Sequence, residues 1–248
     1  MPQPDQSMTT NTLLQVMSPA DYALLQPHLM RVPLARDQIL VAADQPIAQV
    51  YFPEGGVVSI VSSMGSGERT ETGIFGREGL SATCLLLGTD RTPQESFIQV
   101  GDATALRIDT PPYLSAVAGS ETLRALFLRY VQTVLVQDSQ STATNATHRV
   151  EARLARWLLM CHDRIDGDEI ALTHRFMGMM VSAERSGVTV TLHILEGEGL
   201  IRSTRGRVTI RDRAGLEALA GDSYGVAEAE YRKLVGHLGR SEARTPAA

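Results

Sequence analysis

The chain has 248 residues, enough for one large domain or two smaller ones, and its 43% hydrophobic and 21% charged content is typical of a globular protein. We expect no membrane partner and a cytoplasmic location, because no run approaches the roughly 18 apolar residues of a membrane span and the N-terminus has no secretory signal pattern. The two cysteines, Cys84 and Cys161, are too few for a disulfide framework or a four-cysteine cluster.

The net charge of −5 is unevenly distributed along the chain. Residues 1–147 contain 8 basic and 14 acidic side chains, a net charge of −6, whereas residues 148–248 contain 15 and 14, a net charge of +1. An acidic first part joined to a less acidic second part fits a sensor domain followed by a DNA-binding domain.

The first half of the chain predicts a short helix followed by an all-β domain. Ser18 is a helix N-cap with Pro19 at the first helical position. Between Val32 and Ile108, short β-prone runs are separated by glycine-rich breaks, which indicates a β-sandwich or jelly roll. The expected strands are 38–41, 49–52, 57–62, 70–75, 96–100 and 103–108, and 80–87 is a candidate short helix. Pro111 and Pro112 end this region.

A long helical pattern begins near Ser120. Apolar residues recur along it at three-to-four spacing, and we interpret them as the interface of a homodimer, although the same face could instead pack on the chain's own β domain. The predicted interface residues are Leu123, Phe127, Tyr130, Val131 and Val134. The acidic segment 163–169 is expected to be a hinge-like loop.

Residues 173–210 predict a helix, a turn, a second helix and a hairpin, which is a winged helix-turn-helix. Val188, Leu192 and Leu195 give the second helix a buried stripe. Two short strands, 200–203 and 207–210, follow it. Residues 173–213 contain seven Arg and four acidic side chains, a net charge of +3 that suits a nucleic acid.

The face opposite the buried stripe holds the candidate DNA contacts. The start of the second helix enters the major groove in this motif, where an Arg can bond a guanine bidentately. The expected base-reading residues are Arg185, Ser186, Thr189 and Val190, and the expected phosphate-binding residues are Thr173, His174, Arg175, His193, Arg202, Arg205 and Arg207. The alternative is an ordinary solvated helix beside a hairpin.

A last helical pattern lies in residues 221–239, with Tyr224, Ala227, Tyr231, Leu234 and Leu238 on one side. It could cover the winged domain or reach a partner.

Nothing in the sequence indicates an enzyme. The chain has no glycine-rich phosphate loop, no His-Glu-x-x-His zinc motif and no nucleophile elbow. We expect no metal and no cofactor. The rival to a DNA-binding regulator is a dimeric scaffold that binds a protein or an unidentified small ligand.

Over residues 18–212 the chain resembles the Crp/Fnr family of bacterial transcription regulators. The segments that carry the resemblance are YFPEGGVVSIV at 51–61, GREG at 76–79, the helix from 120 and AERSGVTVTLHILEGEGLI at 183–201. The resemblance implies an α+β protein with a cyclic-nucleotide-binding-like β domain (12–111), a dimerisation helix (112–147), a winged helix-turn-helix (148–220) and a C-terminal helix and tail (221–248). It also implies a homodimer on a two-fold symmetric site of double-stranded DNA, with RNA polymerase as a further partner.

The chain departs from the family at the positions that hold cyclic AMP. The Gly-Glu and Arg-Ser pairs of those members correspond here to Gly76-Arg77 and Glu95-Ser96. Glu95 would repel the phosphate, so we expect no cyclic-nucleotide binding unless Arg77 or Arg91 forms a rearranged pocket. Ser186 and Val190 replace two further base-reading residues of the cyclic-AMP type, which predicts a different operator. The effector, the target genes and the direction of regulation stay open.

Overall fold

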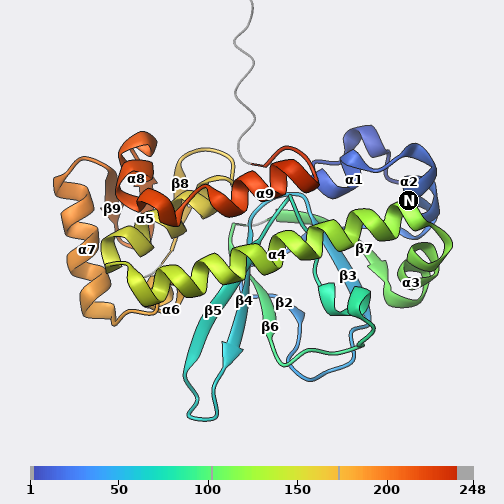
Figure 1. Ribbon diagram of the computed structural model, residues 1–248, viewed down its shortest axis with the longest axis horizontal. Coiled ribbons are helices and arrows are strands. Elements are labelled where there is room, and N and C mark those ends of the chain that lie inside the picture. The colour runs from blue at the N-terminus through green and yellow to red at the C-terminus, as the bar shows by residue number, and fades with distance from the viewer. Residues whose placement is uncertain (1–2, 102, 173, 239–248) are drawn as a thin grey trace, which may run out of the picture.

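The computed structural model describes residues 3–101, 103–172 and 174–238, in which β strands occupy the middle of the first half and helices dominate the second (Figure 1). The N-terminal segment contains η1 (Gln6–Met8), α1 (Thr12–Val16), α2 (Pro19–Leu25) and η2 (Gln26–His28). Ser18 caps α2 as expected, and its hydroxyl accepts the Asp21 N–H. Asn11 caps α1 and also donates to the carbonyls of Pro53 and Gly79, so this segment is tied to the β region.

The β domain consists of two antiparallel sheets. One has the order β1 (Met30–Leu34), β7 (Ala103–Asp109), β3 (Gln49–Pro53), and the other has the order β2 (Ile39–Val41), β6 (Glu95–Val100), β4 (Val57–Ser63), β5 (Arg69–Phe75). All six predicted strands are present. Strand β1 was not predicted because it contains Pro33, but it lies at a sheet edge, where a residue without an N–H is tolerated.

Two helical segments cover the ends of the β domain. The 3-10 turn η3 (Thr83–Leu87) occupies the place of the candidate short helix at 80–87. Pro111 and Pro112 do not simply end the β region, because they begin the helix α3 (Thr110–Gly119), where proline needs no hydrogen-bond partner for its nitrogen. Tyr113 of α3, Phe52 of β3 and Phe127 of the next helix form a cluster of three rings with centroids 5.6–6.5 Å apart.

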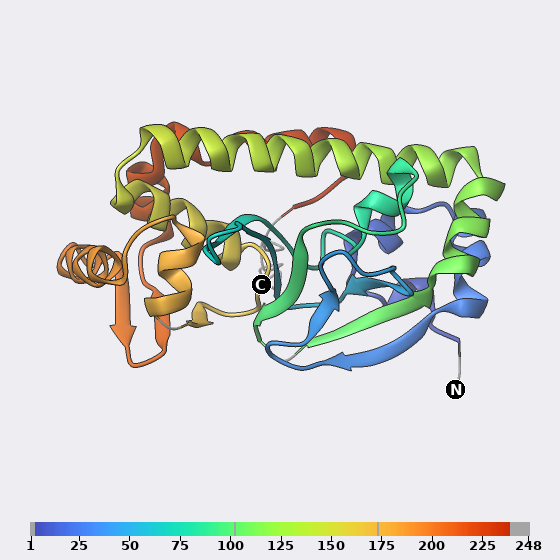
Figure 2. The ribbon, with the colours of Figure 1, turned by 90° about the horizontal axis from the view of Figure 1, so that it is seen from below.

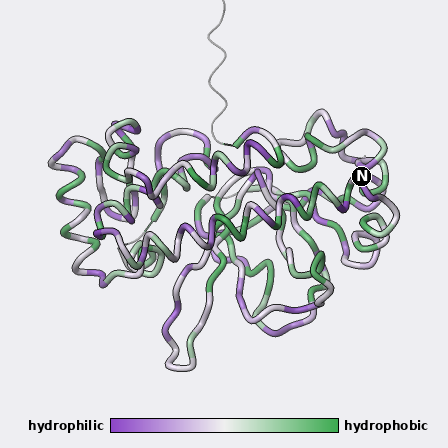
Figure 3. Tube along the Cα trace, viewed as in Figure 1, coloured by the Kyte–Doolittle hydropathy of each residue, from purple (hydrophilic) through white to green (hydrophobic). Residues whose placement is uncertain are grey.

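The long helix α4 (Glu121–Thr147) begins at Ser120, whose hydroxyl accepts the Leu123 N–H, and it runs past both parts of the molecule (Figure 2). Apolar and polar residues alternate along it (Figure 3). The structure places the predicted dimer residues against the chain's own β domain: Leu123 and Phe127 are 0% exposed, Tyr130 and Val131 are buried, and Val134 is half-buried. Three-to-four spacing predicts that a helix face is buried but does not identify the surface that covers it. These residues pack on the chain's own β domain, which was the alternative to a dimer interface.

The C-terminal domain comprises α5 (Val150–His162), β8 (Glu169–Ala171), α6 (His174–Met180), α7 (Arg185–Gly197), β9 (Ile201–Thr204), β10 (Arg207–Ile210) and α8 (Arg213–Ala220). The sheet order is β8-β10-β9, so the acidic segment at 163–169 ends in a third strand that the sequence reading missed. Gly206, with φ +75°, makes the turn between β9 and β10.

After η4 (Gly221–Ser223), the helix α9 (Val226–Leu234) returns from the C-terminal domain and lies beside α4 (Figure 1). Its Tyr231 hydroxyl donates to the Glu78 carbonyl at 2.6 Å, and the Leu234 carbonyl accepts from Arg129 of α4 at 2.9 Å. Tyr231 and Leu238 join the apolar core of the β domain. The segment therefore covers the winged domain at Tyr224, which packs on its core, and covers the β domain at Tyr231 and Leu238.

Buried polar contacts join the two domains. Arg164, in the loop after α5, forms a 2.8 Å ion pair with Glu78 of the β domain, and both side chains are nearly fully buried. Trp157 of α5 donates its indole N–H to Glu71 of β5 at 2.7 Å. The orientation of the C-terminal domain is therefore set by specific contacts with the β domain.

Candidate nucleic-acid interface

The geometry of the site begins with the turn between α6 and α7. Ser182 has a positive φ of 49°, and the Ala183 N–H donates to the Gly178 carbonyl at 3.0 Å. A Cβ at Gly178 would lie 2.8 Å from the Ala183 carbonyl oxygen, so this close approach requires glycine. Arg153 of α5 donates to the carbonyls of Val181 and Ser182, and these hydrogen bonds hold the turn against α5. The sequence reading missed this role of Arg153, for which no motif gives a signal.

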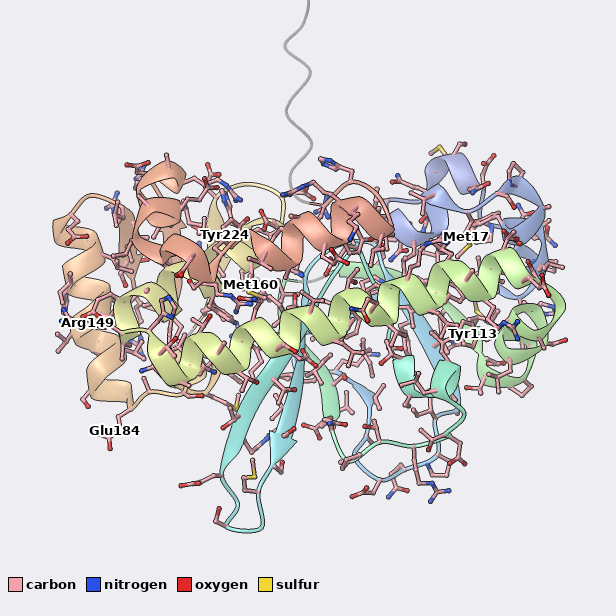
Figure 4. The ribbon with its side chains drawn as sticks, viewed as in Figure 1. Met17, Tyr113, Arg149, Met160, Glu184 and Tyr224 are labelled. Atoms are coloured by element: carbon pink, nitrogen blue, oxygen red, sulfur yellow. The ribbon has the colours of Figure 1, made fainter. Side chains whose placement is uncertain are left out.

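The buried side of α7 follows the predicted stripe. Val188, Leu192 and Leu195 are each no more than 1% exposed and belong to the core that α5 and α8 share. Glu184 precedes the helix at an outer end of the molecule (Figure 4). The stripe therefore fixes which side chains of α7 face solvent.

The outer face of α7 contains three of the four predicted base-reading residues as exposed side chains. Arg185 and Ser186 are exposed in the first turn, and Val190 is 59% exposed one turn later. Thr189 is half-buried, and its hydroxyl donates to the Arg185 carbonyl at 2.9 Å. Ile194, 39% exposed and four residues after Val190, was missed because it reads as a core residue in sequence.

The hairpin β9–β10 supplies a second cationic surface next to α7. Arg202 and Arg205 are exposed, and Arg207 is exposed although it forms a 3.0 Å ion pair with Glu169 of β8. His193 is exposed on α7 itself. Guanidinium groups at such positions are suited to phosphate oxygens.

The remaining predicted phosphate contacts lie at the start of α6. Thr173 lies outside the described residues, and so do the side chains of His174 and Arg175.

One arginine of the basic segment has a structural position instead. Arg213 donates to Asp163 at 2.8 Å and to the Tyr224 hydroxyl at 2.7 Å, and it forms an ion pair with Glu217. The Tyr224 hydroxyl donates to Asp163, and burial raises the pKa of that tyrosine above its ordinary value. Arg213 thus joins α8 to the end of α5.

The arginines at or near the positions that correspond to the cyclic-AMP site form ion pairs within the chain. Arg77 bonds the Arg164 carbonyl and Asp166 at 2.9 Å, and Arg91 pairs with its neighbour Asp90. Glu95 is paired with Arg69. Arg77 and Arg91 therefore each have a carboxylate partner in the structure.

The described residues contain neither a candidate metal site nor a candidate membrane-spanning helix. Within residues 3–101, 103–172 and 174–238, no group of three metal-ligating side chains comes together. In the same part of the chain, no helix is both long and apolar enough to cross a bilayer.

Comparison with known proteins gives one family match and many structural ones. Residues 152–219 match the Crp-like helix-turn-helix domain. A Crp/Fnr-family transcriptional regulator of Eubacterium rectale is similar in structure, with a TM-score of 0.65, 16% identity, and 84% of this chain and 97% of that one covered. FixK2 of Bradyrhizobium japonicum has a TM-score of 0.64 at 16% identity, covering 78% and 98% of the two chains.

The c-di-GMP-responsive regulator CLP of Xanthomonas campestris has a TM-score of 0.61 at 15% identity, covering 78% of this chain and 99% of CLP. At such identities the likeness shows a shared fold. No curated protein matches the sequence.

Proposed function

We propose that the chain, which contains a Crp-like helix-turn-helix domain and has the Crp/Fnr fold, is a DNA-binding transcription regulator that acts as a homodimer on a two-fold symmetric operator without binding cyclic AMP. The observation that supports DNA reading best is the outer face of α7. This face exposes Arg185 in the first turn of α7, beside the hairpin that contains Arg202, Arg205 and Arg207. The opposite face of α7 is buried in the core. In this assignment the effector domain comprises residues 12–111, and the dimerisation helix comprises 112–147. The DNA-binding domain comprises 148–220, and a C-terminal helix and tail comprise 221–248.

Base reading is assigned to the first two turns of α7. Arg185 is placed to bond guanine O6 and N7, and Val190 to contact a thymine methyl group. Ser186 and Thr189 complete the reading set. The hairpin residues Arg202, Arg205 and Arg207, together with His193, Thr173, His174 and Arg175, are assigned to phosphates, which position the domain without specifying sequence.

The dimer contact is assigned to the outer face of α4. Leu128 and Leu135 are 41% and 55% exposed there, seven residues apart. Exposed or half-exposed small and polar residues continue the same three-and-four spacing: Ala125, Gln132, Ser139, Thr142 and Ala146. This stripe runs along the exposed side of α4, so a second α4 can pack along it in coiled-coil fashion. Two reading helices on such a dimer would meet half-sites one helical turn apart.

The effector is assigned to a class other than cyclic AMP. Glu95 stands at the matching phosphate position, and its partner is Arg69, whereas Arg77 is bonded to Asp166. We also assign RNA polymerase as a partner and the cytoplasm as the location, and no catalytic activity, because these follow from transcription regulation.

The test is DNA binding by fluorescence anisotropy after selection of a preferred sequence from a random pool. Arg185→Ala should weaken binding to the selected sequence by roughly 1–3 kcal/mol and relax its base preference, whereas Arg205→Ala should weaken all sequences alike and lower the salt slope by about one. Arg36→Ala, an exposed arginine of the β domain, is the matched control and should bind as the wild type does.

Equal binding of operator and random DNA by the wild type and Arg185→Ala removes Arg185 from base reading. A chain with no DNA affinity even at low salt would support the scaffold instead.

A further inference from the structure

A cavity of about 150 Å³ lies between the second sheet, η3 and α4. This volume is roughly that of an apolar cavity that accommodates a benzene ring. Its apolar lining comes from Val41, Ile60, Phe75, Leu80, Ala82, Leu87, Val131, Val134 and Leu135. The cavity can therefore hold the body of a small organic molecule.

The polar lining of this cavity has no positive charge. Among the described residues, no Arg, Lys or His side chain lines it, and the neutral polar groups are Thr72, Thr83, Cys84, Thr92, Gln94, Ser96 and Tyr130. Asp138 of α4 is the one carboxyl group in the same lining. An anion placed here would lose its hydration without gaining a counter-charge, which is strongly unfavourable.

The carboxyl group of Asp138 has an oxygen without a hydrogen-bond donor. Within the described part of the chain, its Oδ1 is buried and has no partner. Oδ1 lies directly over Gly73, where a Cβ would approach it to 2.5 Å, so the glycine leaves room for the carboxyl group. A buried acceptor left without a donor costs free energy, so the chain does not fully satisfy this carboxyl group. The rest of the Asp138 side chain is the part that borders the cavity.

The protein's own cation does not fill this role. Arg156 is the charge that acts on Asp138, but its guanidinium donates to the Ser223 carbonyl at 2.8 Å and to the Ser141 hydroxyl at 3.2 Å. Burial raises the pKa of Asp138 to about 6, so the group is ionised at pH 8. At that pH the half-buried carboxylate of Asp138 is the one charged group among the described residues that line the cavity.

We propose that this cavity binds a small organic ammonium compound, whose apolar body fills the space and whose N–H donates to Asp138. Leu135 both lines the cavity and lies on the outer face of α4, 55% exposed. A ligand there contacts the helix on which the proposed dimer stripe lies and can favour one arrangement of the dimer. That effector role rests on the proposed function, whereas the binding itself does not.

The experiment is isothermal titration calorimetry of the full-length chain at pH 8 with benzylamine, benzyl alcohol, benzoate and cyclic AMP. We expect saturable binding of benzylamine, at least tenfold weaker binding of benzyl alcohol, and no binding of benzoate or cyclic AMP. N,N,N-Trimethylbenzylammonium has the charge without an N–H and should bind more weakly than benzylamine.

Asp138→Asn should lower the affinity for benzylamine at least tenfold and abolish its preference over benzyl alcohol. Asp37→Asn is the control, since Asp37 is exposed, has a positive φ of 62° that Asn also tolerates, and lies away from the cavity lining. Its affinity should equal that of the wild type.

Benzoate or cyclic AMP binding as tightly as benzylamine, no saturable benzylamine binding, or an unchanged affinity in Asp138→Asn would each overturn the proposal. DNA anisotropy on the same samples keeps the two proposals apart. Amine binding without DNA binding contradicts only the regulator, and DNA binding without amine binding contradicts only the ligand class.

Discussion

Glu71 makes the stability of the chain depend on pH in a defined way, and Glu71→Gln should remove that dependence. The side chain is buried between β4, β6 and α5, where it bonds Ser59 and Trp157. The Ser59 hydroxyl has one proton, yet it lies within hydrogen-bond distance of both Glu71 and Gln99. A protonated Glu71 fits both contacts, because it can donate to Ser59, which then donates to Gln99.

Burial raises the pKa of Glu71 from its ordinary 4.5 to about 8, against the opposing effect of its bonds with Ser59 and Trp157. The native state then keeps a proton that the unfolded chain releases above about pH 4.5. Stability is therefore fully present below that pH and is lost as the pH rises toward 8. At about 1.4 kcal/mol per pKa unit, the loss between pH 5 and pH 9 is about 4 kcal/mol.

The assay is urea unfolding followed by the fluorescence of Trp157, the one tryptophan of the chain, at pH 5, 7 and 9. The amide of Glu71→Gln can donate to Ser59 and accept from Trp157 without titrating. The difference in unfolding free energy between this variant and the wild type should therefore shift in favour of the variant by about 4 kcal/mol from pH 5 to pH 9.

Glu68→Gln, an exposed position on the same hairpin, is the matched control and should show a nearly constant difference from the wild type. If the difference for Glu71→Gln is equally flat, the carboxyl group is already ionised in the native state and the reasoning fails.

Three further outcomes follow from the interfaces. Arg164→Met should lower the free energy of unfolding by roughly 3–5 kcal/mol, because it leaves Glu78 buried without its partner. In urea unfolding, the double variant with Glu78→Met should regain most of that free energy, and additive destabilisation by the two substitutions would contradict this. Leu135→Asp should convert the proposed homodimer to a monomer in analytical ultracentrifugation at unchanged helix content, and a persisting dimer would exclude the outer face of α4 as its interface. Leu123→Ala, by contrast, should cost roughly 2–5 kcal/mol of stability, because Leu123 is 0% exposed in the chain's own core, and should leave the association state unaltered.

The sequence by itself determined the elements whose signals are local. Strand alternation between glycine-rich breaks predicted six of the strands, and Ser18 predicted the start of α2. The stripe at Val188, Leu192 and Leu195 predicted which side of α7 is buried. These signals succeed because one residue type at one spacing decides which face of a strand or helix avoids water.

Tertiary structure decided what covers each face. The apolar face of α4 meets its own β domain, and α9 lies along α4 to tie the reading domain to Glu78 through Tyr231. The pairings of Arg164 with Glu78 and of Trp157 with Glu71 join residues 86 positions apart, which no local pattern encodes. Three further features depend on such distant neighbours: the burial of Glu71, the space beside Gly73 that Asp138 occupies, and the ion pair of Arg77 with Asp166. No local pattern predicts them, because desolvation and hydrogen bonding act through space and not along the chain.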